Sequence, residues 1–426
     1  MLAIFLIVLF LLIFTYLPIA FCLLITAVVL MFLITGSVSP AVLTQSIVRG
    51  MDNFPLMAIP FFVLAGEIMS HGGISKRIVA FAKALLGHIR GGLGYVSVLA
   101  SMLFAGISGS AIADTTAIGS IMLPMMEDED YDKGTSTALI ISAGTIGPII
   151  PPSVPMILFG VVSGASIAKL FMGGIIPGVI IGLGLMFIWF MHTRKYKEKY
   201  AVSTSFSGKR LWKATKEAFW PLLLMVIIIV GILGGIFTAT EAGVVAVMYA
   251  LVLGFIYREL KVKDLFPILI KSVKTTAVVM LVVGTATAAS YFITTAQIPT
   301  QLTNTLLSIS TNPYVVMLLI NILMLLVGCV MDLTPALLIL APILTPIVTS
   351  MGFDPIYFGV VLVCNLCIGI ITPPVGTVLY VGCGLSDMSM SELVKPTLPF
   401  LAMMIITLLI ITYMPGLVML IPNLCS

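Results

Sequence analysis

The sequence predicts an all-α polytopic membrane protein, and three observations lead to that fold class. First, 60% of the 426 residues are hydrophobic and only 9% are charged, against roughly 25% charged residues in ordinary globular chains. Second, hydrophobic stretches follow one another along nearly the whole chain. Third, many stretches are interrupted by glycine and proline, as in helices that break inside a membrane. This composition excludes a cytosolic enzyme, a nucleic-acid-binding protein and a secreted disulfide scaffold.

Hydrophobic segments divide the chain into two halves. In the first half they are residues 2–34 (long enough for two spans, with Pro18 near the break), 54–69, 92–106, 135–150, 154–168 and 171–191. In the second half they are residues 219–237, 242–257, 265–293, 313–331, 336–349, 356–371, 375–385 and 397–421. A full membrane crossing takes about 20 residues. The shorter segments are therefore predicted to be re-entrant hairpins or broken helices.

A polar interval at residues 193–218 separates the halves. Its basic residues are Arg194, Lys195, Lys197, Lys199, Lys209, Arg210, Lys213 and Lys216, opposed by Glu198 and Glu217. The positive-inside rule predicts that this interval is cytoplasmic, together with the basic clusters at 76–90 and 258–274. Residues 208–218 predict an interfacial amphipathic helix with Leu211 and Trp212 toward lipid. The predicted organisation is a first half at 1–192, a connecting arm at 193–218 and a second half at 219–426.

Patterns for metal binding, redox chemistry and catalysis are missing from the sequence. The three histidines are far apart, so no metal site is expected. Cys364 and Cys367 have CxxC spacing but lie in an apolar run, which predicts small buried hydrophobic side chains. No HExxH, GxSxG or P-loop motif occurs. An enzyme is therefore not expected.

A series of spacing matches between the halves indicates an internal duplication. The matched positions, first half before second half, are Asp114 and Asp332, Pro124 and Pro342, Gly147 and Gly369, Pro151-Pro152 and Pro373-Pro374, and Gly160 and Gly382. They occur in the same order and with nearly the same spacing. The two repeats are expected at about 92–168 and 313–385.

Helix breaks inside a membrane need partners for their backbone groups, since each unpaired group costs several kcal/mol there. An ion or a polar substrate can supply them, because helix N-termini attract anions and carbonyl ends attract cations. Ser108, Gly109 and Ser110 are suited to the tip of a re-entrant hairpin, because two hydroxyls flank a glycine that lets the backbone turn sharply. Neutral oxygens that suit Na⁺ lie near the other breaks, at Thr145, Ser153, Asn365 and Thr372. The alternative is that these small residues only pack helices and that the Pro-Pro pairs are kinks.

Four acidic residues are predicted to lie in or near membrane segments. Asp114 and Asp332 are expected either to cap helices or to bind a cation or a substrate hydroxyl. Glu241 is expected to cap the helix at 242–257, and Glu67 to be structural.

Basic residues are scarce around the repeats. The first repeat and its flanks contain only Lys133 and Lys169, and the chain after Thr275 contains only Lys395. An anionic substrate would then have its charge met by helix N-termini, hydroxyls and co-bound cations. This scarcity predicts transport that depends on Na⁺.

Six segments resemble the large membrane subunit of tripartite ATP-independent periplasmic (TRAP) transporters. They are 60–78, 87–119, 147–153, 235–243, 332–343 and 365–376, including GISGSAIADTTAIG and NLCIGIITPPVG. The resemblance implies an elevator-type symporter of the bacterial inner membrane, with inverted repeats, two re-entrant hairpins and a transport domain that moves against a scaffold. It also implies a small four-helix membrane subunit, a periplasmic substrate-binding protein, and uptake of an organic acid anion with Na⁺.

The resemblance further implies hairpin tips at 106–110 and around 328–332, with substrate near Ser108, Ser153 and Asp332. Sodium would be held by main-chain oxygens near Ser108, Ser110, Thr145, Gly147, Gly328, Cys329, Gly369 and Thr372. Structural or ion-linked roles are expected for Asp114, Glu241, Asn365, Pro151, Pro152, Pro373 and Pro374. The chain starts with its own first spans, so the small subunit is expected to be a separate polypeptide. Sialic acid is the first substrate hypothesis and a C4-dicarboxylate the second.

Three rival functions remain at this point. A stand-alone sodium/dicarboxylate or citrate-type symporter also uses duplicated hairpins. A sodium/proton antiporter or ion channel would use Asp114 and Asp332 as ion carriers. A membrane enzyme is disfavoured because no nucleophile and base are paired.

Overall fold

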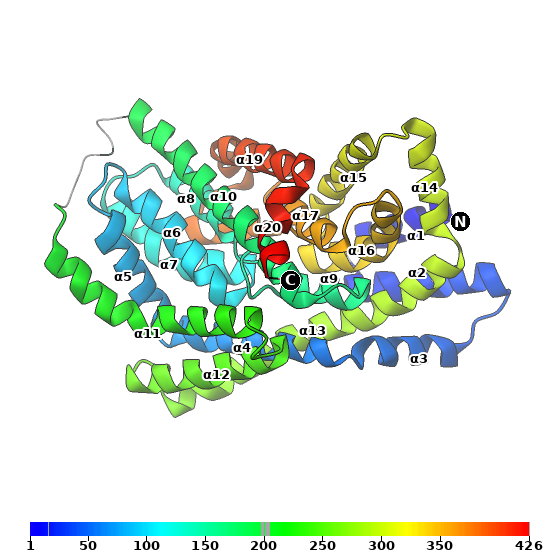
Figure 1. Cartoon of the computed structure of the whole chain (residues 1–426), viewed down its shortest axis with the longest axis horizontal. Coiled ribbons are helices and arrows are strands. Elements are labelled where there is room, and N and C mark those ends of the chain that lie inside the picture. Colours follow the sequence, from blue (N-terminus) through cyan, green and yellow to red (C-terminus); the bar gives the residue numbers. More distant parts are fainter. Residues whose placement is uncertain (16, 197–199, 201–204, 426) are drawn as a thin grey trace.

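The computed structural model describes residues 1–15, 17–196, 200 and 205–425, and none of these residues lies in a strand (Figure 1). The all-α prediction is confirmed. The chain begins with α1 Leu2–Phe14, α2 Ile19–Thr35, α3 Pro40–Met51, the 3-10 helix η1 Phe54–Met57, α4 Ala58–His71 and α5 Ile74–Leu86. The first repeat contains α6 Gly92–Ser108, α7 Ala111–Asp128, α8 Lys133–Gly144 and α9 Val154–Ser163.

Five helices connect the repeats: α10 Ile167–Lys195, α11 Gly208–Leu233, α12 Ala239–Ile256, α13 Val262–Thr295 and α14 Ile298–Ile309. The second repeat contains α15 Pro313–Gly328, α16 Leu333–Ser350, α17 Pro355–Gly369 and α18 Thr377–Ser386. The chain closes with α19 Met390–Tyr413 and α20 Pro415–Leu424. The break predicted near Pro18 is present, because this proline precedes α2.

Seven helical segments among the described residues are long and apolar enough to cross a membrane. They are Phe54–His71, α10, α11, α12, α13, α16 and α19. Helices α14 and α15, bent by 120° at their junction, would make an eighth span. Several helices of the repeats, among them α6, α9 and α18, are apolar but shorter. Their shortness agrees with the predicted broken helices.

The helices form two layers (Figure 1). In the first, the long-helix layer, α13 packs along α2, α3 and α4, and α12 packs against α4. The second, the repeat layer, contains both repeats, which interlock: α9 packs on α16 and α17, and α18 packs on α7 and α8. The layers meet where α13 touches α16 and where α4 touches α6. The hairpin tips therefore face the long-helix layer.

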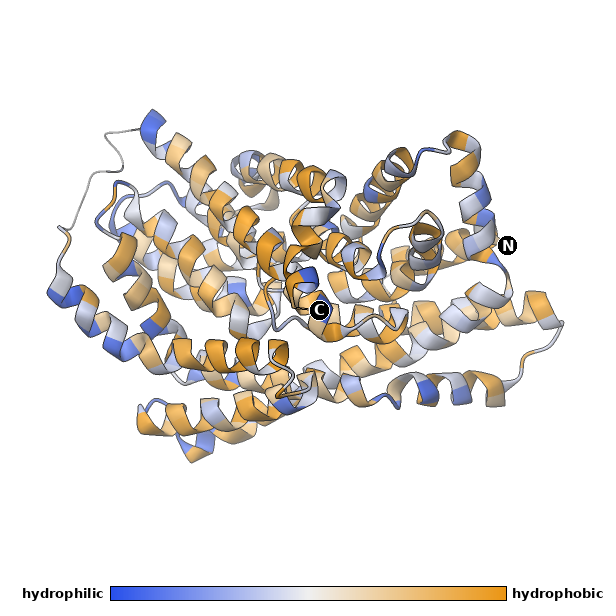
Figure 2. Ribbon diagram, in the orientation of Figure 1, coloured by the Kyte–Doolittle hydropathy of each residue, from blue (hydrophilic) through white to orange (hydrophobic). Residues whose placement is uncertain are grey.

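The three predicted basic segments gather at one end of the molecule, where Figure 2 shows hydrophilic residues at the end of α10, the start of α11 and the end of α12. Helix α5 packs against α11. The Arg77 guanidinium lies 3.7 Å above the ring of Tyr257, which joins α5 to the end of α12. This proximity supports a common membrane side for the three segments. Lys197, Glu198 and Lys199 lie outside the described residues.

Two local predictions meet different outcomes. Residues 208–218 do not form a separate interfacial helix, because α11 continues through them to Leu233, although Trp212 is 65% exposed as expected. Glu241 does cap α12, since its Oε2 accepts hydrogen bonds from the Thr238 N–H (2.8 Å) and hydroxyl (2.9 Å). This capping box satisfies donors that the first turn of the helix would otherwise leave open.

Candidate functional site

Both repeats have the same order of helices and breaks, which confirms the predicted duplication. In each repeat a helix ends at a short break, a second helix follows, and a third helix ends at a longer break before the fourth begins. The longer breaks, residues 145–153 and 370–376, contain the two Pro-Pro pairs. Both Pro151-Pro152 and Pro373-Pro374 are joined by cis peptide bonds.

The helix starts set the true register between the repeats. Ser110 is the N-cap of α7, and Asp332 is the N-cap of α16. Pro124 and Pro346 each lie 14 residues after these N-caps. Ser110 and Asp332 are therefore the structurally matched residues.

The prediction that Asp114 and Asp332 occupy equivalent positions is wrong. It rested on the spacing to Pro342, but α16 contains a second proline four residues later, about one helical turn. Counted from the N-caps, Asp114 corresponds to Ala336. The two carboxylates consequently have different surroundings.

Asp114 is fully buried in the first turn of α7, where it bridges the two breaks of the first repeat. Its Oδ1 accepts a hydrogen bond from the Ser108 hydroxyl. Its Oδ2 has no hydrogen-bond partner within the described part of the chain. A Cβ at Gly147 would lie 2.1 Å from Oδ2, so the second break lies directly against that oxygen. The cap of α7 is Ser110, so the predicted capping role of Asp114 is wrong.

A second buried oxygen lies beside Asp114 in sequence and faces the same part of the repeat. The Thr115 hydroxyl is buried and lacks a partner among the described residues. A Cβ at Gly144 would lie 2.0 Å from it. Two unpartnered oxygens, one from a carboxylate, thus face the end of α8. Buried polar atoms are costly unless something pairs with them, so this cluster fits a cation.

Asp332 lies at the equivalent break of the second repeat in a more open place. It is only partly buried, and its side chain makes no capping hydrogen bond to α16. Its Oδ1 accepts a hydrogen bond of 3.0 Å from the hydroxyl of Thr377, the first residue of α18. This contact joins the two breaks of the second repeat while leaving the carboxylate beside a cavity.

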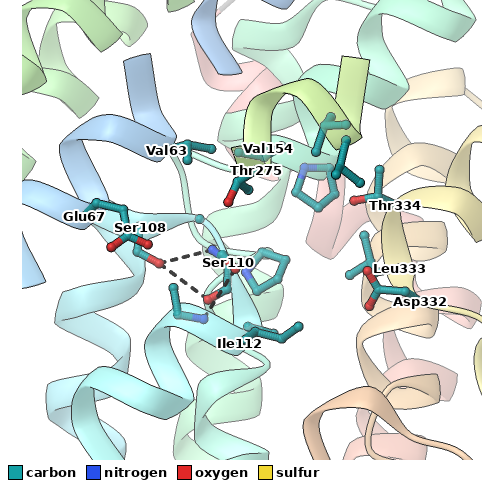
Figure 3. Close-up of a pocket in the computed structure, with 18 of the residues that line it drawn as sticks. Val63, Glu67, Ser108, Ser110, Ile112, Val154, Thr275, Asp332, Leu333 and Thr334 are labelled. Atoms are coloured by element: carbon teal, nitrogen blue, oxygen red, sulfur yellow. Dashed lines mark hydrogen bonds between the residues drawn. The ribbon is translucent and has the colours of Figure 1, made fainter. Parts of the chain in front are cut away.

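The cavity has a volume of about 630 Å³ and lies between the hairpin tips and the long-helix layer (Figure 3). Three predicted site residues line it: Ser108, Ser110 and Asp332. In Figure 3, Ser108 and Ser110 lie on one side, with Glu67 beside Ser108, and Asp332 lies opposite with Thr334. The structure therefore brings the first tip and the start of α16 to one cavity.

Most other predicted residues lie behind this cavity and do not line it. Ser153 is fully buried and caps α9 by accepting the Met156 N–H (3.2 Å), while its hydroxyl donates to the Pro148 carbonyl. The hydroxyls of Thr145 and Thr372 donate to carbonyls of their own segments, each at 2.7 Å. Ser153 is therefore a helix cap in this conformation and does not itself line the cavity, although the neighbouring Val154 does.

The glycines and Asn365 of the second repeat hold its breaks together. Gly328 and Gly369 touch through their backbones, since a Cβ at Gly369 would lie 2.6 Å from the Gly328 Cα. Cys329 is buried at the same break, and its carbonyl accepts the Val375 N–H at 3.3 Å. The Asn365 amide donates to the Asn321 carbonyl and side chain at 3.0 and 2.8 Å. These contacts join α15 to α17.

Two lysines from α13 line the cavity, which corrects the expectation that the site has almost no fixed bases. Lys271 Nζ lies 2.9 Å from Glu67 Oε1, and Lys274 lines the cavity from the next turn. Sequence reasoning placed both lysines in a cytoplasmic cluster and gave Glu67 a structural role. The usable signal was their i, i+3 spacing, which puts two ammonium groups on one helix face.

The described part of the chain contains no group of three or more His, Cys, Asp or Glu side chains that could hold a metal ion. Cys364 and Cys367 are free thiols buried in α17, as the apolar run predicted.

Comparison with known proteins covers nearly the whole chain. Residues 6–417 match the model of the family described as "Tripartite ATP-independent periplasmic transporter, DctM component". The 2,3-diketo-L-gulonate TRAP transporter large permease protein YiaN of Escherichia coli is 44% identical, with 95% of each chain covered. The sialic acid TRAP transporter large permease protein SiaM of Vibrio cholerae is 41% identical, covering 97% of this chain and 96% of that protein.

Among solved structures, the YdaH transporter of Alcanivorax borkumensis has a similar fold. The TM-score is 0.66 at 13% sequence identity, with 93% of this chain and 96% of that chain covered. At this identity the likeness concerns the fold alone.

Proposed function

This chain belongs to the DctM component family of tripartite ATP-independent periplasmic transporters, and from that premise we propose that it imports an organic acid anion together with Na⁺ through the cavity at its hairpin tips. As a family member it is a large permease, a multi-pass protein of the bacterial inner membrane, and its relatives are named as transporters and not as enzymes. The cavity between the tips is the observation that carries the proposal.

An organic acid suits the lining of the cavity. Hydroxyls from Ser108 and Thr334 can bind substrate oxygens, and the lysines of α13 can attract a carboxylate. Asp332 can accept a hydrogen bond from a substrate hydroxyl. The names of YiaN and SiaM refer to two different acids that both carry a carboxylate and hydroxyls. Sialic acid is the first candidate for this chain and a C4-dicarboxylate the second.

Sodium coupling is supported by the charges around the cavity. Its charged lining residues are Glu67, Asp332, Lys271 and Lys274, whose formal charges cancel. An entering anion therefore leaves a net negative charge that a co-bound cation would offset. The unpartnered Oδ2 of Asp114 supplies a buried anionic oxygen beside the breaks of the first repeat. We propose that one Na⁺ binds there, together with the predicted main-chain oxygens of the first repeat, and that the predicted main-chain oxygens of the second repeat bind another.

An elevator movement is supported by how the two layers meet. The repeats interlock with each other through α9, α16, α17 and α18, whereas on the side of the long-helix layer α4 and α5 contact α6, and α13 and α14 contact α16. A unit whose helices interlock in this way can move as one body. We propose that the repeat layer carries substrate and Na⁺ across the membrane against the long-helix layer.

The partners proposed are those of a tripartite system: a separate small four-helix membrane subunit and a periplasmic binding protein that delivers the acid. The family description supports the need for further components, and the two relatives above are named large permeases with nearly the same length.

Reconstitution tests this function. The chain and its small subunit are placed in liposomes, and uptake of radiolabelled N-acetylneuraminate or succinate is measured with a loaded binding protein, with and without an inward Na⁺ gradient. We expect uptake only with both the gradient and the binding protein. Uptake of free acid without a binding protein would instead indicate the stand-alone symporter, and proton-coupled Na⁺ flux without any acid would indicate the antiporter.

A further inference from the structure

The ion pair between Glu67 and Lys271 lies inside the cavity and crosses from α4 to α13. The Lys271 ammonium is 2.9 Å from Glu67 Oε1, within the range of a charge-assisted hydrogen bond. Both residues line the same cavity as the first hairpin tip. Helix α4 touches that tip, since a Cβ at Gly66 would lie 3.5 Å from the Ser108 Cα. The pair is therefore a direct neighbour of any substrate held at the tip.

The two partners of this pair are unequally buried. The side chain of Lys271 is 63% exposed, whereas that of Glu67 is 14% exposed. Ion pairs with a solvated partner contribute little net stability, because water competes for the charges. Lys271 can therefore exchange one carboxylate for another at small cost. Glu67 keeps a second basic neighbour, since its Oε2 lies 3.9 Å from His71 Nδ1.

We propose that Lys271 is the group that binds the substrate carboxylate on the α13 side of the cavity, and that Glu67 is its internal competitor. In the empty cavity the Lys271 ammonium is paired with the Glu67 carboxylate. The carboxylate of an incoming organic acid displaces Glu67 from this ammonium, and the ion pair forms again when the acid leaves. The competitor weakens binding and so favours release of the acid.

This exchange rests on the proposed function, and it adds a prediction that a merely structural ion pair does not make. Removing the negative charge of Glu67 should tighten binding of an acid, because Lys271 is then free. Removing the ammonium should weaken binding of the acid while leaving a neutral analogue unaffected. A structural ion pair would give neither result, because either change would only loosen the contact between α4 and α13.

The test uses the purified complex of this chain with its small subunit. Binding of N-acetylneuraminate and of its uncharged methyl ester is measured by calorimetry at fixed Na⁺, with succinate and dimethyl succinate as the second pair of probes. We expect Glu67→Gln to bind the acid about tenfold more tightly and Lys271→Met about tenfold more weakly, the size expected for one charge-assisted hydrogen bond. The double variant should behave like Lys271→Met, and Lys271→Arg should retain the preference for acid over ester.

Lys263→Met is the matched control, since Lys263 lies exposed on the same helix and does not line the cavity. It should bind both probes as the wild type does. Thermal unfolding of each complex checks that the variants fold. The exchange is overturned if Glu67→Gln binds the acid equally or more weakly, or if Lys271→Met keeps the preference for the acid. If the wild type takes up the acid but the variants bind acid and ester as the wild type does, only the proposed exchange is contradicted. If the wild type takes up no acid at all, both the proposed function and the exchange are contradicted.

Discussion

The first breaks of the two repeats share a backbone plan and differ in where their charge lies. In the first repeat, Asp114 is sealed inside the protein with the Ser108 hydroxyl on one oxygen and none of the described residues bonded to the other. In the second repeat, Asp332 faces the cavity and is held from behind by Thr377. The two repeats therefore share their helix breaks but differ in the position of the acidic side chain, Asp114 in one and Asp332 in the other.

The second breaks differ in a similar way. Ser153 caps α9 with its side chain, whereas α18 begins after Gly376, which has no side chain to offer. The backbones of the two breaks meet closely in both repeats, since a Cβ at Gly109 would lie 2.6 Å from the Pro152 carbonyl oxygen and a Cβ at Gly369 would lie 2.6 Å from the Gly328 Cα. The different places of the two carboxylates suggest a division of labour in which Asp114 of the first repeat binds the proposed buried cation and Asp332 of the second repeat faces the substrate.

The largest effect should follow from Asp114→Asn, which keeps the shape of the side chain and removes its charge. Loss of a contact between a charged group and its partner costs about 1.5–3 kcal/mol, which corresponds to about 10- to 100-fold in uptake. Uptake driven by a Na⁺ gradient should fall by that factor, and its dependence on Na⁺ concentration should shift to higher values. Glu127→Gln, near the exposed end of the same helix, should change neither. Normal Na⁺ dependence in Asp114→Asn would contradict the proposed difference between the buried Asp114 and the cavity-facing Asp332.

A somewhat smaller effect is expected for Asp332→Asn. Because this carboxylate faces the cavity, we expect weaker binding of the acid, by about tenfold, with the Na⁺ dependence unchanged. Calorimetry on the purified complex measures the first quantity, and uptake at varied Na⁺ measures the second. Asp354→Asn is the control, since Asp354 caps α17 in the same repeat and does not line the cavity. Equal shifts in the Na⁺ dependence of uptake for the Asp114 and Asp332 variants would show that the two carboxylates share one role.

Thr377→Val should have a modest effect, because it removes only the neutral donor to Asp332. A net loss of about 1 kcal/mol predicts weaker acid binding by roughly fivefold. Thr377→Ser keeps the hydroxyl and should bind the acid as the wild type does. A loss as large as that of Asp332→Asn would mean that the threonine itself contacts the substrate.

The smallest effect should come from Ser110→Ala. The Ser110 hydroxyl accepts the Ala113 N–H at 3.4 Å, a long contact, and loss of a serine cap costs about 1 kcal/mol. Because we expect Ser110 to bind Na⁺ through its main-chain oxygen, the substitution should change uptake less than twofold. The complex should unfold at a slightly lower temperature. A large loss of Na⁺ dependence would instead assign a role to the hydroxyl.

Sequence reasoning found the helix breaks because glycine and proline interrupt hydrophobic runs in matched order. It did not find the register of the repeats, because α16 carries two prolines one turn apart and only the helix start decides between them. It also missed α3, α5 and α14 as helices. These are short helices with polar faces, so they leave no long apolar run to detect.

The members of the site were predictable in part. Ser108, Ser110 and Asp332 come from the breaks themselves, and these residues do line the cavity. Lys271, Lys274 and Glu67 were not assigned to it, because the direction of a side chain on a long helix depends on how that helix packs. Only the packing of α13 along α4 turns a cluster of basic residues into part of a cavity.

The contact between Gly328 and Gly369 has a consequence for how sequences of this kind can drift. Every other amino acid carries a Cβ, and at Gly369 that atom would collide with the backbone of the other glycine and not with a movable side chain. A replacement at Gly369 cannot be accommodated by a compensating side-chain change at its partner. Descendants of this chain that keep its transport activity should therefore retain this glycine while the lipid-facing surface around it changes freely.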